Sequence, residues 1–461
     1  MPMLPPALAV FLALGAVPAA AAPLRTEAAS FKLADGTELP VERGTFSVPE
    51  DRNDPRSRRI DIGFIRFKST SPKPGAPIVY LAGGPGGSGI AAAQGPRQPV
   101  FLALRAVADV IALDQRGVGV SNPIPPCTAR RRLDPAAPLT EATLSAYYRE
   151  TLERCLGEWR SAGVAVTGYT TEQNADDLED LRKALGARKI DLWGISYGTH
   201  LAFAAMRRHP RSIGRVALAS AEGLGQTVKL PAHIDATFAR IERFAPGLGA
   251  RMRRVHARFD AAPQAFTLEG GTSFRTDSFP LRMMAGILPK NPDGIARLAG
   301  AYQALEANQT QALAPLVYNY FFKDPVTLSG MPELMDIASG VSDSTLALAR
   351  RQAADSLLGT ATNFPMPQLR GAVPGLELGD GFRREVESNI PVLLLSGDLD
   401  VRTPLEEQAA ATAGLKRLHR ILVRNGGHDL FEAHPDVPAI LVDFFSGRKV
   451  GVTVLTLPPP R

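Results

Sequence analysis

The sequence predicts an α/β fold: a mostly parallel sheet with helices on both faces and an inserted helical cap domain. Three observations predict it. Short buried apolar runs alternate with amphipathic segments, glycine-rich turns follow several of these runs, and one interval of roughly 170 residues interrupts the alternation. The composition, 45% hydrophobic and 21% charged over 461 residues, is that of a globular protein and excludes the disordered and collagen-like classes.

Seven apolar runs bounded by Gly, Pro or Asp are typical of strands buried on both faces of a sheet. They lie at 60–67, 78–82, 110–113, 190–195, 216–219, 392–395 and 421–423. The clearest helix between them, 171–185, begins at a threonine, has acids in its first turn and ends before Gly186. Strand, helix and strand in alternation favour parallel pairing.

The long interval lies between the strand ending near Ser220 and the strand starting near Pro391. A parallel crossover needs only about a dozen residues. We therefore assign 225–386 to a helical cap over the carboxyl edge of the sheet, where open α/β sheets bind ligands. Its helical patterns are 234–244, 295–305 and 332–349; residues 23–224 and 387–450 form the core, and 451–461 a C-terminal tail.

The N-terminus has the pattern of a cleaved leader. An uncharged apolar run, 7–17, is followed by alanines that offer A-x-A cleavage at Ala20 and Ala22, although no Lys or Arg precedes the run. The run is too short to span a bilayer. We expect a signal peptide over 1–22, a secreted or periplasmic protein, and no stable membrane insertion; the alternative is a misassigned start codon.

Cys127 and Cys155 could form a disulfide in an exported protein, or remain two buried thiols.

The remaining composition says little about binding partners. The net charge of +6 does not by itself identify a partner. The arginines at 130–132 lack interleaved aromatic residues or any nucleic-acid motif, so we expect no nucleic acid.

Gly194-Ile195-Ser196-Tyr197-Gly198 matches the G-x-S-x-G nucleophile elbow. An apolar run leads into it and a helical pattern, 199–208, leads out, as the motif requires. The glycines permit a sharp turn that would project Ser196 Oγ above the sheet at a helix N-terminus. Ser196 is the predicted nucleophile; the alternative is a structural serine in a βα turn.

A serine nucleophile needs a base, and the base needs an acceptor on its other nitrogen. Run 421–423 is followed by His428 in a glycine-rich turn, and run 392–395 by Asp398 and Asp400. The order Ser, Asp, His fits this topology. His428 is the predicted base, and pattern alone does not choose between the two acids. His200, one turn after Ser196, is expected to be packed or at the surface.

Another glycine-rich loop, 83–89, follows the run 78–82. Its glycines could surround a phosphate, but no Lys-Ser/Thr pair completes a P-loop. We expect it to form an oxyanion hole, with one N–H from Gly84 and the other from Tyr197.

Together these motifs resemble α/β-hydrolases of the serine aminopeptidase group, the proline iminopeptidase and tripeptidyl aminopeptidase type. The resemblance covers most of the core: 83–89, 114–121, 194–198, 397–400 with 403–404, and 427–428. It implies the α/β-hydrolase fold, Asp400 as triad acid, and structural roles for Asp114 and Arg116, with Arg116 pairing with carboxylates or carbonyls near the oxyanion loop. Ala82 stands where iminopeptidases commonly have His, and the cap matches weakly, so selectivity does not transfer.

An aminopeptidase must also bind the ammonium group of its substrate, which calls for a carboxylate in a desolvated pocket. Glu222, just after the run 216–219, is the best-placed candidate; the alternative is a loop acid facing water. The cap aromatics Tyr318, Tyr320, Phe321 and Phe322 could line a pocket or form a helix core.

The predicted function is a secreted serine hydrolase that forms an acyl-enzyme, an aminopeptidase by resemblance. The alternatives are a carboxylic-ester hydrolase and a catalytically silent binding protein on the same scaffold. An Asp nucleophile is disfavoured because Ser occupies the elbow. We expect a peptide or small ester as substrate, no cofactor and no metal, since no HExxH motif occurs and His428 and His434 are badly spaced for one helical face.

Overall fold

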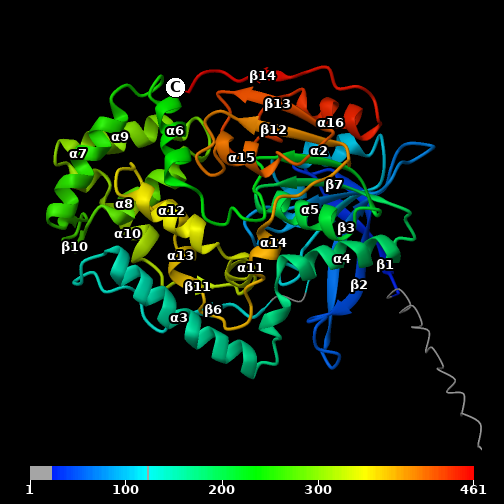
Figure 1. The fold of residues 1–461 in the computed structure, drawn as a ribbon, viewed down its shortest axis with the longest axis horizontal. Coiled ribbons are helices and arrows are strands. Elements are labelled where there is room, and N and C mark those ends of the chain that lie inside the picture. Colours follow the sequence, from blue (N-terminus) through cyan, green and yellow to red (C-terminus); the bar gives the residue numbers. More distant parts are fainter. Residues whose placement is uncertain (1–22, 122–123, 461) are drawn as a thin grey trace, which may run out of the picture.

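The computed structural model describes residues 23–121 and 124–460; the predicted leader, 1–22, lies outside them. A ten-stranded sheet in the order β1-β2-β3-β5-β4-β7-β8-β12-β13-β14 runs through the molecule (Figure 1). Pairing is antiparallel from β1 to β5 and parallel from β5 to β14. The predicted α/β fold with a mostly parallel sheet is confirmed.

All seven apolar runs form strands of this sheet. They are β3 (Arg59–Phe67), β4 (Ile78–Leu81), β5 (Val110–Leu113), β7 (Ile190–Ile195), β8 (Ile213–Ala219), β12 (Val392–Gly397) and β13 (Leu418–Arg424). Three further strands were not predicted: β1 (Arg25–Lys32), β2 (Glu38–Pro49) and β14 (Val454–Thr456). The last of these lies within 451–461 and pairs with β13, so this segment extends the sheet.

Successive side chains of the central strands point to opposite faces, and each face is covered by helices. Trp193 and Ile195 of β7 pack with α1 (Gly89–Gln94), α2 (Gln98–Leu104) and α16 (Val437–Phe445). Ile190 and Leu192 pack on the other face with α4 (Thr171–Ala184) and α5 (Tyr197–Arg208). A short helix, α15 (Leu405–Ala411), follows β12. Burial on both faces explains why these strands are continuously apolar.

Residues 225–386 form helices that lie to one side of the sheet in Figure 1. They are α6 (Pro231–Ile241), α7 (Leu248–Ala261), α8 (Phe279–Ile287), α9 (Gly294–Glu306), α10 (Ala314–Phe321), α11 (Met331–Ser339), α12 (Asp343–Ala353), α13 (Met366–Leu369) and α14 (Asp380–Arg383), with a hairpin of β9 (Gln264–Thr267) and β10 (Ser273–Thr276). The helical pattern at 332–349 is divided between two helices, α11 and α12. Gly340, with φ of 58°, ends α11, and the Ser342 hydroxyl caps α12.

One helix outside this insertion also lies along it: α3 (Glu141–Ser161) runs beside the cap helices in Figure 1. The preceding strand β6 (Cys127–Thr128) pairs with β11 (Thr327–Leu328) of the insertion. A disulfide joins Cys127 to Cys155 of α3, so the bridge, and not a pair of thiols, is what the structure contains.

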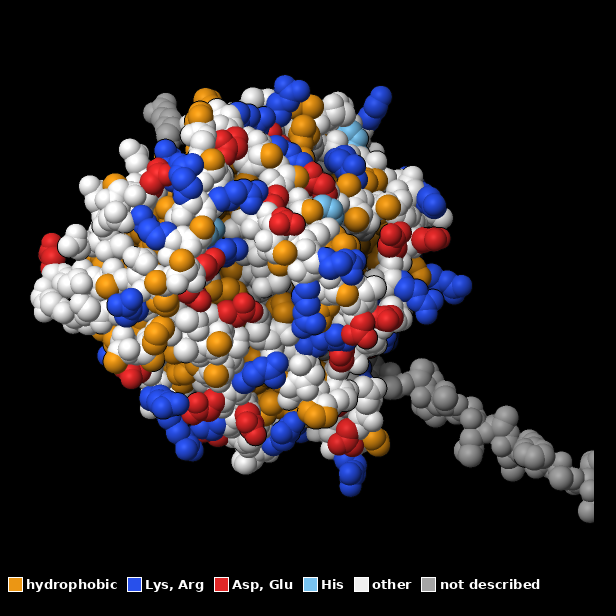
Figure 2. All heavy atoms as spheres, turned by 60° about the vertical axis from the view of Figure 1, so that its left-hand side comes forward, with side chains coloured by type: hydrophobic (Ala, Val, Ile, Leu, Met, Phe, Trp, Pro, Cys, Tyr) orange, Lys and Arg blue, Asp and Glu red, His pale blue; other side chains and the backbone are white. Residues whose placement is uncertain are grey.

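Within the described residues, no helix has both the length and the apolar character that crossing a membrane would require. On the face shown in Figure 2, Lys and Arg side chains are interspersed with Asp and Glu and do not form a continuous basic stripe.

Candidate active site

The nucleophile elbow lies between β7 and α5, with Ser196 at φ 55° and ψ −128°. Its two glycines are sterically required. A Cβ at Gly194 would lie 2.7 Å from the carbonyl oxygen of Gly198, and a Cβ at Gly198 would lie 2.0 Å from the carbonyl oxygen of Leu81. Holding a non-glycine residue at such a backbone conformation costs on the order of 1 kcal/mol or more, which is typical of functional sites.

The loop after β4 packs directly against this elbow. A Cβ at Gly83 would lie 2.9 Å from Ser196 Cβ, and Gly84 has φ of 126°, a conformation suited to glycine. Tyr197 is the first residue of α5, where a backbone N–H has no partner within the helix. Neither the Gly84 nor the Tyr197 N–H donates a hydrogen bond to another residue of the described chain. Both predicted oxyanion donors therefore lie beside Ser196 with an N–H available.

The acid next to the predicted base is Asp400. His428 Nδ1 lies 3.0 Å from Asp400 Oδ2 and 3.1 Å from Oδ1. The Arg402 and Thr403 N–H groups each donate to Oδ1 at 2.9 Å, and the Thr403 hydroxyl donates to Oδ2 at 2.6 Å. Burial raises the pKa of Asp400, but the charge of His428 and the hydrogen bonds from His428 and Thr403 outweigh it and hold the pKa below its ordinary value. Asp398 instead pairs with Arg243.

His428 is held from both sides of its backbone. Its N–H donates to the carbonyl of Lys290 at 2.8 Å, and its own carbonyl accepts from the Ser220 hydroxyl at 2.8 Å. Lys290 belongs to the insertion, in a short 3₁₀ turn (Leu288–Lys290). A Cβ at Gly427 would lie 2.4 Å from the Lys290 carbonyl oxygen, so glycine permits this approach. The insertion thus helps to fix the loop that presents the imidazole.

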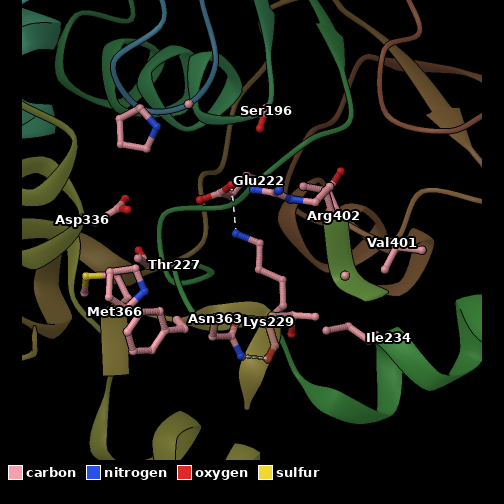
Figure 3. A pocket seen from close by; sticks show the side chains of 17 residues that line it. Ser196, Glu222, Thr227, Lys229, Ile234, Asp336, Asn363, Met366, Val401 and Arg402 are labelled. Carbon is pink, nitrogen blue, oxygen red and sulfur yellow. Dashed lines mark hydrogen bonds and ion pairs between the residues drawn. The ribbon is translucent and has the colours of Figure 1, made fainter. Parts of the chain in front are cut away.

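Two cavities flank Ser196, and Gly84, Ser196 and Arg402 line both of them. The first, called here the cap-side cavity, is lined further by Glu222, Thr227, Lys229 and Asp336 (Figure 3). The second, the histidine-side cavity, is lined further by His428, Asp429, Arg97 and Lys290. His428 and Ser196 thus share the wall of one cavity, and in the described chain no hydrogen bond joins them.

Glu222 is not a loop acid facing water. Its side chain is buried and its Oε2 lies 2.9 Å from Lys229 Nζ, with both groups in the cap-side cavity (Figure 3). The backbone N–H of Glu222 donates to the Thr199 hydroxyl of α5 at 2.7 Å, which ties its loop to the nucleophile helix. The carboxylate expected to receive a substrate ammonium is therefore already paired with an ammonium of the chain itself.

A second acid, Asp336 of α11, lines the same cavity (Figure 3). Within the described residues its carboxylate makes no hydrogen bond or ion pair. Removal of surrounding water, together with the nearby charge of Glu222, raises the pKa of Asp336 well above its ordinary value. Sequence reasoning missed this residue; the only signal was one acid inside an otherwise apolar part of a helical pattern.

Asp114 and Arg116 have the structural roles that the resemblance implied. Both Oδ atoms of Asp177 accept from the buried Arg116 guanidinium at 2.7 Å, and the carbonyls of Glu50 and Gly168 also accept from it. Asp114 accepts from the Ser88 hydroxyl at 2.6 Å, at the start of α1 just after the oxyanion loop.

His200 is a packed histidine, as expected. Its Nδ1 lies 3.1 Å from the Gly223 carbonyl and its Nε2 lies 3.1 Å from the Ser339 hydroxyl. Burial lowers its pKa to about 4. Of the four cap aromatics, Phe321 and Phe322 are buried in an apolar cluster made mostly of cap residues, Tyr318 packs against it, and Tyr320 is exposed. None of the four lines either cavity.

Comparison with known proteins adds a family and several relatives. A family model described as alpha/beta hydrolase fold matches residues 76–435. A tripeptidyl aminopeptidase of Streptomyces coelicolor is 33% identical over 172 residues, which are 35% of this chain and 31% of that protein. The serine protease Hip1 of Mycobacterium tuberculosis is 32% identical over 178 residues, 37% of this chain and 34% of that protein. The matches thus span about a third of the length of each relative.

Proposed function

The chain belongs to the α/β-hydrolase family, and from this we propose that it is a serine hydrolase that acts as an aminopeptidase on peptides with a free N-terminus. The observation that carries the proposal is the position of Ser196 at the wall of a cavity that also holds two carboxylates, Glu222 and Asp336. The peptidase names of the two relatives support the same substrate class. Export by the 1–22 leader remains a prediction from the sequence.

The mechanism uses Ser196, His428 and Asp400. Ser196 Oγ attacks the scissile carbonyl carbon while His428 Nε2 takes its proton, and Asp400 on Nδ1 fixes the imidazole tautomer and stabilises the imidazolium. The oxyanion that forms accepts from the N–H groups of Gly84 and Tyr197. His428 then gives the proton to the leaving nitrogen as the C–N bond breaks. Water, activated by the same imidazole, hydrolyses the ester to release the acyl group and regenerate Ser196.

The cap-side cavity accounts for a preference for free amines. Two acids, Glu222 and Asp336, and two cations, Lys229 and Arg402, line this cavity. Glu222 pairs with Lys229, whereas Asp336 has no ion-pair partner within the described residues. An incoming ammonium supplies the counter-charge that Asp336 lacks, and desolvation makes that pairing strong. An N-blocked peptide brings no such charge and leaves Asp336 without a partner.

Two measurements test this function. Fluorophosphonate labelling should modify the wild type and the Ser88→Ala variant but not Ser196→Ala. Ser88 is the matched control because its hydroxyl borders the histidine-side cavity while bonded to Asp114. An unlabelled wild type would favour a binding protein on a hydrolase scaffold.

The second measurement compares prolyl-, alanyl- and tripeptidyl-anilides with a p-nitrophenyl ester. We expect at least one free-amine anilide to be cleaved, with its N-acetylated form cleaved at least about tenfold more slowly, the effect of one charge-assisted contact. Turnover of the ester alone would replace the aminopeptidase with an ester hydrolase.

A further inference from the structure

The histidine-side cavity differs in charge from the cap-side cavity. Three cationic side chains line it, Arg97, Lys290 and Arg402, against a single lining acid, Asp429. Asp429 forms ion pairs with Lys290 Nζ at 2.8 Å and with Arg97 Nη2 at 3.0 Å. Arg97 Nε also forms an ion pair with Glu432 at 2.8 Å. Arg97 and Lys290 are thereby engaged in ion pairs.

Arg402 is different from the other two cations. Its backbone N–H is bonded to Asp400 Oδ1, but its guanidinium makes no ion pair or hydrogen bond with any residue that the structure describes. The side chain is exposed and lines both cavities together with Ser196. In the view of Figure 3 it extends from beside Val401 toward the region between Ser196 and Lys229. An unengaged guanidinium therefore stands next to the nucleophile.

The chemistry of acyl transfer decides which part of a substrate occupies each cavity. His428 must deliver a proton to the leaving nitrogen, so the leaving group lies on the side of the imidazole. His428 lines only one of the two cavities, the cationic one. The acyl group with its ammonium then lies on the other side of Ser196, near Glu222 and Asp336.

We propose that Arg402 binds the C-terminal carboxylate of the leaving group, so that the substrates are short peptides recognised at both charged ends. This inference rests on the proposed aminopeptidase function. A guanidinium matches a carboxylate with two parallel N–H donors. Because Arg402 shares a cavity with Ser196 and each extended residue adds about 3.5 Å, we expect the leaving group to be short.

The test uses pairs of substrates with the same acyl group, the best one from the anilide panel, and with alanine or alaninamide as leaving group. The measured quantity is the ratio of kcat/KM for the free acid to that for the amide, which cancels effects common to both. We expect a ratio of about ten for the wild type, about one for Arg402→Gln, and below one for Arg402→Glu. The wild-type ratio should fall at 1 M salt because the contact is partly exposed.

Arg188→Gln is the matched control, since Arg188 is an exposed arginine in the turn before β7, at the opposite end of that strand from Ser196. It should keep the wild-type ratio, and circular dichroism should show that all variants are folded. A wild-type ratio near one with intact anilide hydrolysis overturns this inference alone. An Arg402→Gln ratio that stays near ten also overturns it. A wild type that cleaves neither anilides nor peptides ends the proposed function itself.

Discussion

The sheet edge and the insertion contribute to the candidate site in different ways. At the sheet edge, Ser196, Asp400 and His428 each lie on a tight turn at the end of a parallel strand, and the backbone of that turn determines where the side chain points. From the insertion, Asp336 comes from the middle of α11, where its position depends on how the helix packs. The comparison teaches that the groups proposed for bond cleavage are placed by local backbone geometry, whereas the acid proposed to recognise the substrate's charge is placed by the packing of a helix.

The largest expected effect tests the sheet-edge half. Asp400→Asn should lower kcat by about 10⁴-fold, because an amide in this place favours the wrong imidazole tautomer and no longer stabilises the imidazolium. Steady-state kinetics on the best anilide measure it.

The neighbouring acid provides the control for that variant. Asp398→Asn should change kcat by no more than a few-fold, since Asp398 pairs with Arg243 and not with His428. If the two variants lost activity equally, the assignment of Asp400 as triad acid would be wrong.

An intermediate effect is expected where the two regions meet. Gly427→Ala places a Cβ 2.4 Å from the Lys290 carbonyl, so the loop must shift and the hydrogen bond from His428 N–H weakens. Because a displacement of about 1 Å can cost on the order of 100-fold, we expect kcat to fall about 10- to 100-fold. Gly300→Ala, inside α9 with open space around the new Cβ, should leave kcat unchanged. Full activity of Gly427→Ala would show that the insertion does not position the imidazole.

The smallest effect concerns the insertion's own acid. Asp336→Asn should reduce the preference for free-amine over N-acetylated anilide by about tenfold, with little change on the acetylated substrate. The preference should also depend on pH. The raised pKa keeps Asp336 protonated to a higher pH than an ordinary carboxyl. The preference of the wild type should therefore grow as pH rises above the ordinary carboxyl range, up to the pH at which the substrate amine begins to lose its proton.

Both substrates depend equally on the groups that break the bond, so the ratio of the two substrates cancels any effect of pH on that step. Asp336→Asn should show a flat ratio over the same pH range. Glu222→Gln provides the comparison within the cavity: it leaves Lys229 without its partner and should lower the preference further. A pH-dependent ratio that survives in Asp336→Asn would assign the ammonium site to another residue.

Much of the sheet edge could be predicted because its signals are local. The seven apolar runs are strands buried on both faces, and the elbow glycines are forced by contacts of 2.7 Å and less. The strand β1 escaped notice because its side chains are largely polar and exposed. The strand β2 escaped notice because its buried residues, such as Phe46 and Val48, alternate with less buried ones and do not form a continuous apolar run. The break at Gly340 had a local signal, a glycine followed by the capping Ser342, which the apolar periodicity of 332–349 outweighed.

The pairing of Glu222 with Lys229 had no such signal, and Asp336 had only a weak one, an acid in an apolar part of a helical pattern. Lys229 is seven positions from Glu222 in a loop, and Asp336 is more than one hundred positions away, so their meeting follows from tertiary packing alone. Arg402, two residues after Asp400, has no feature in the sequence that distinguishes it from other exposed arginines. Only the structure shows that it lines both cavities beside Ser196.

The Cys127–Cys155 bridge affects more of the structure than the loop that it closes. Cys127 lies opposite Leu328 in the β6–β11 pair. The helix α11 begins three residues after Leu328, at Met331, and contains Asp336. A reducing medium that opened the bridge would loosen the attachment at the start of this helix. Under the proposed function, opening the bridge should therefore disturb the position of Asp336 more than that of Ser196, which lies on the turn after β7.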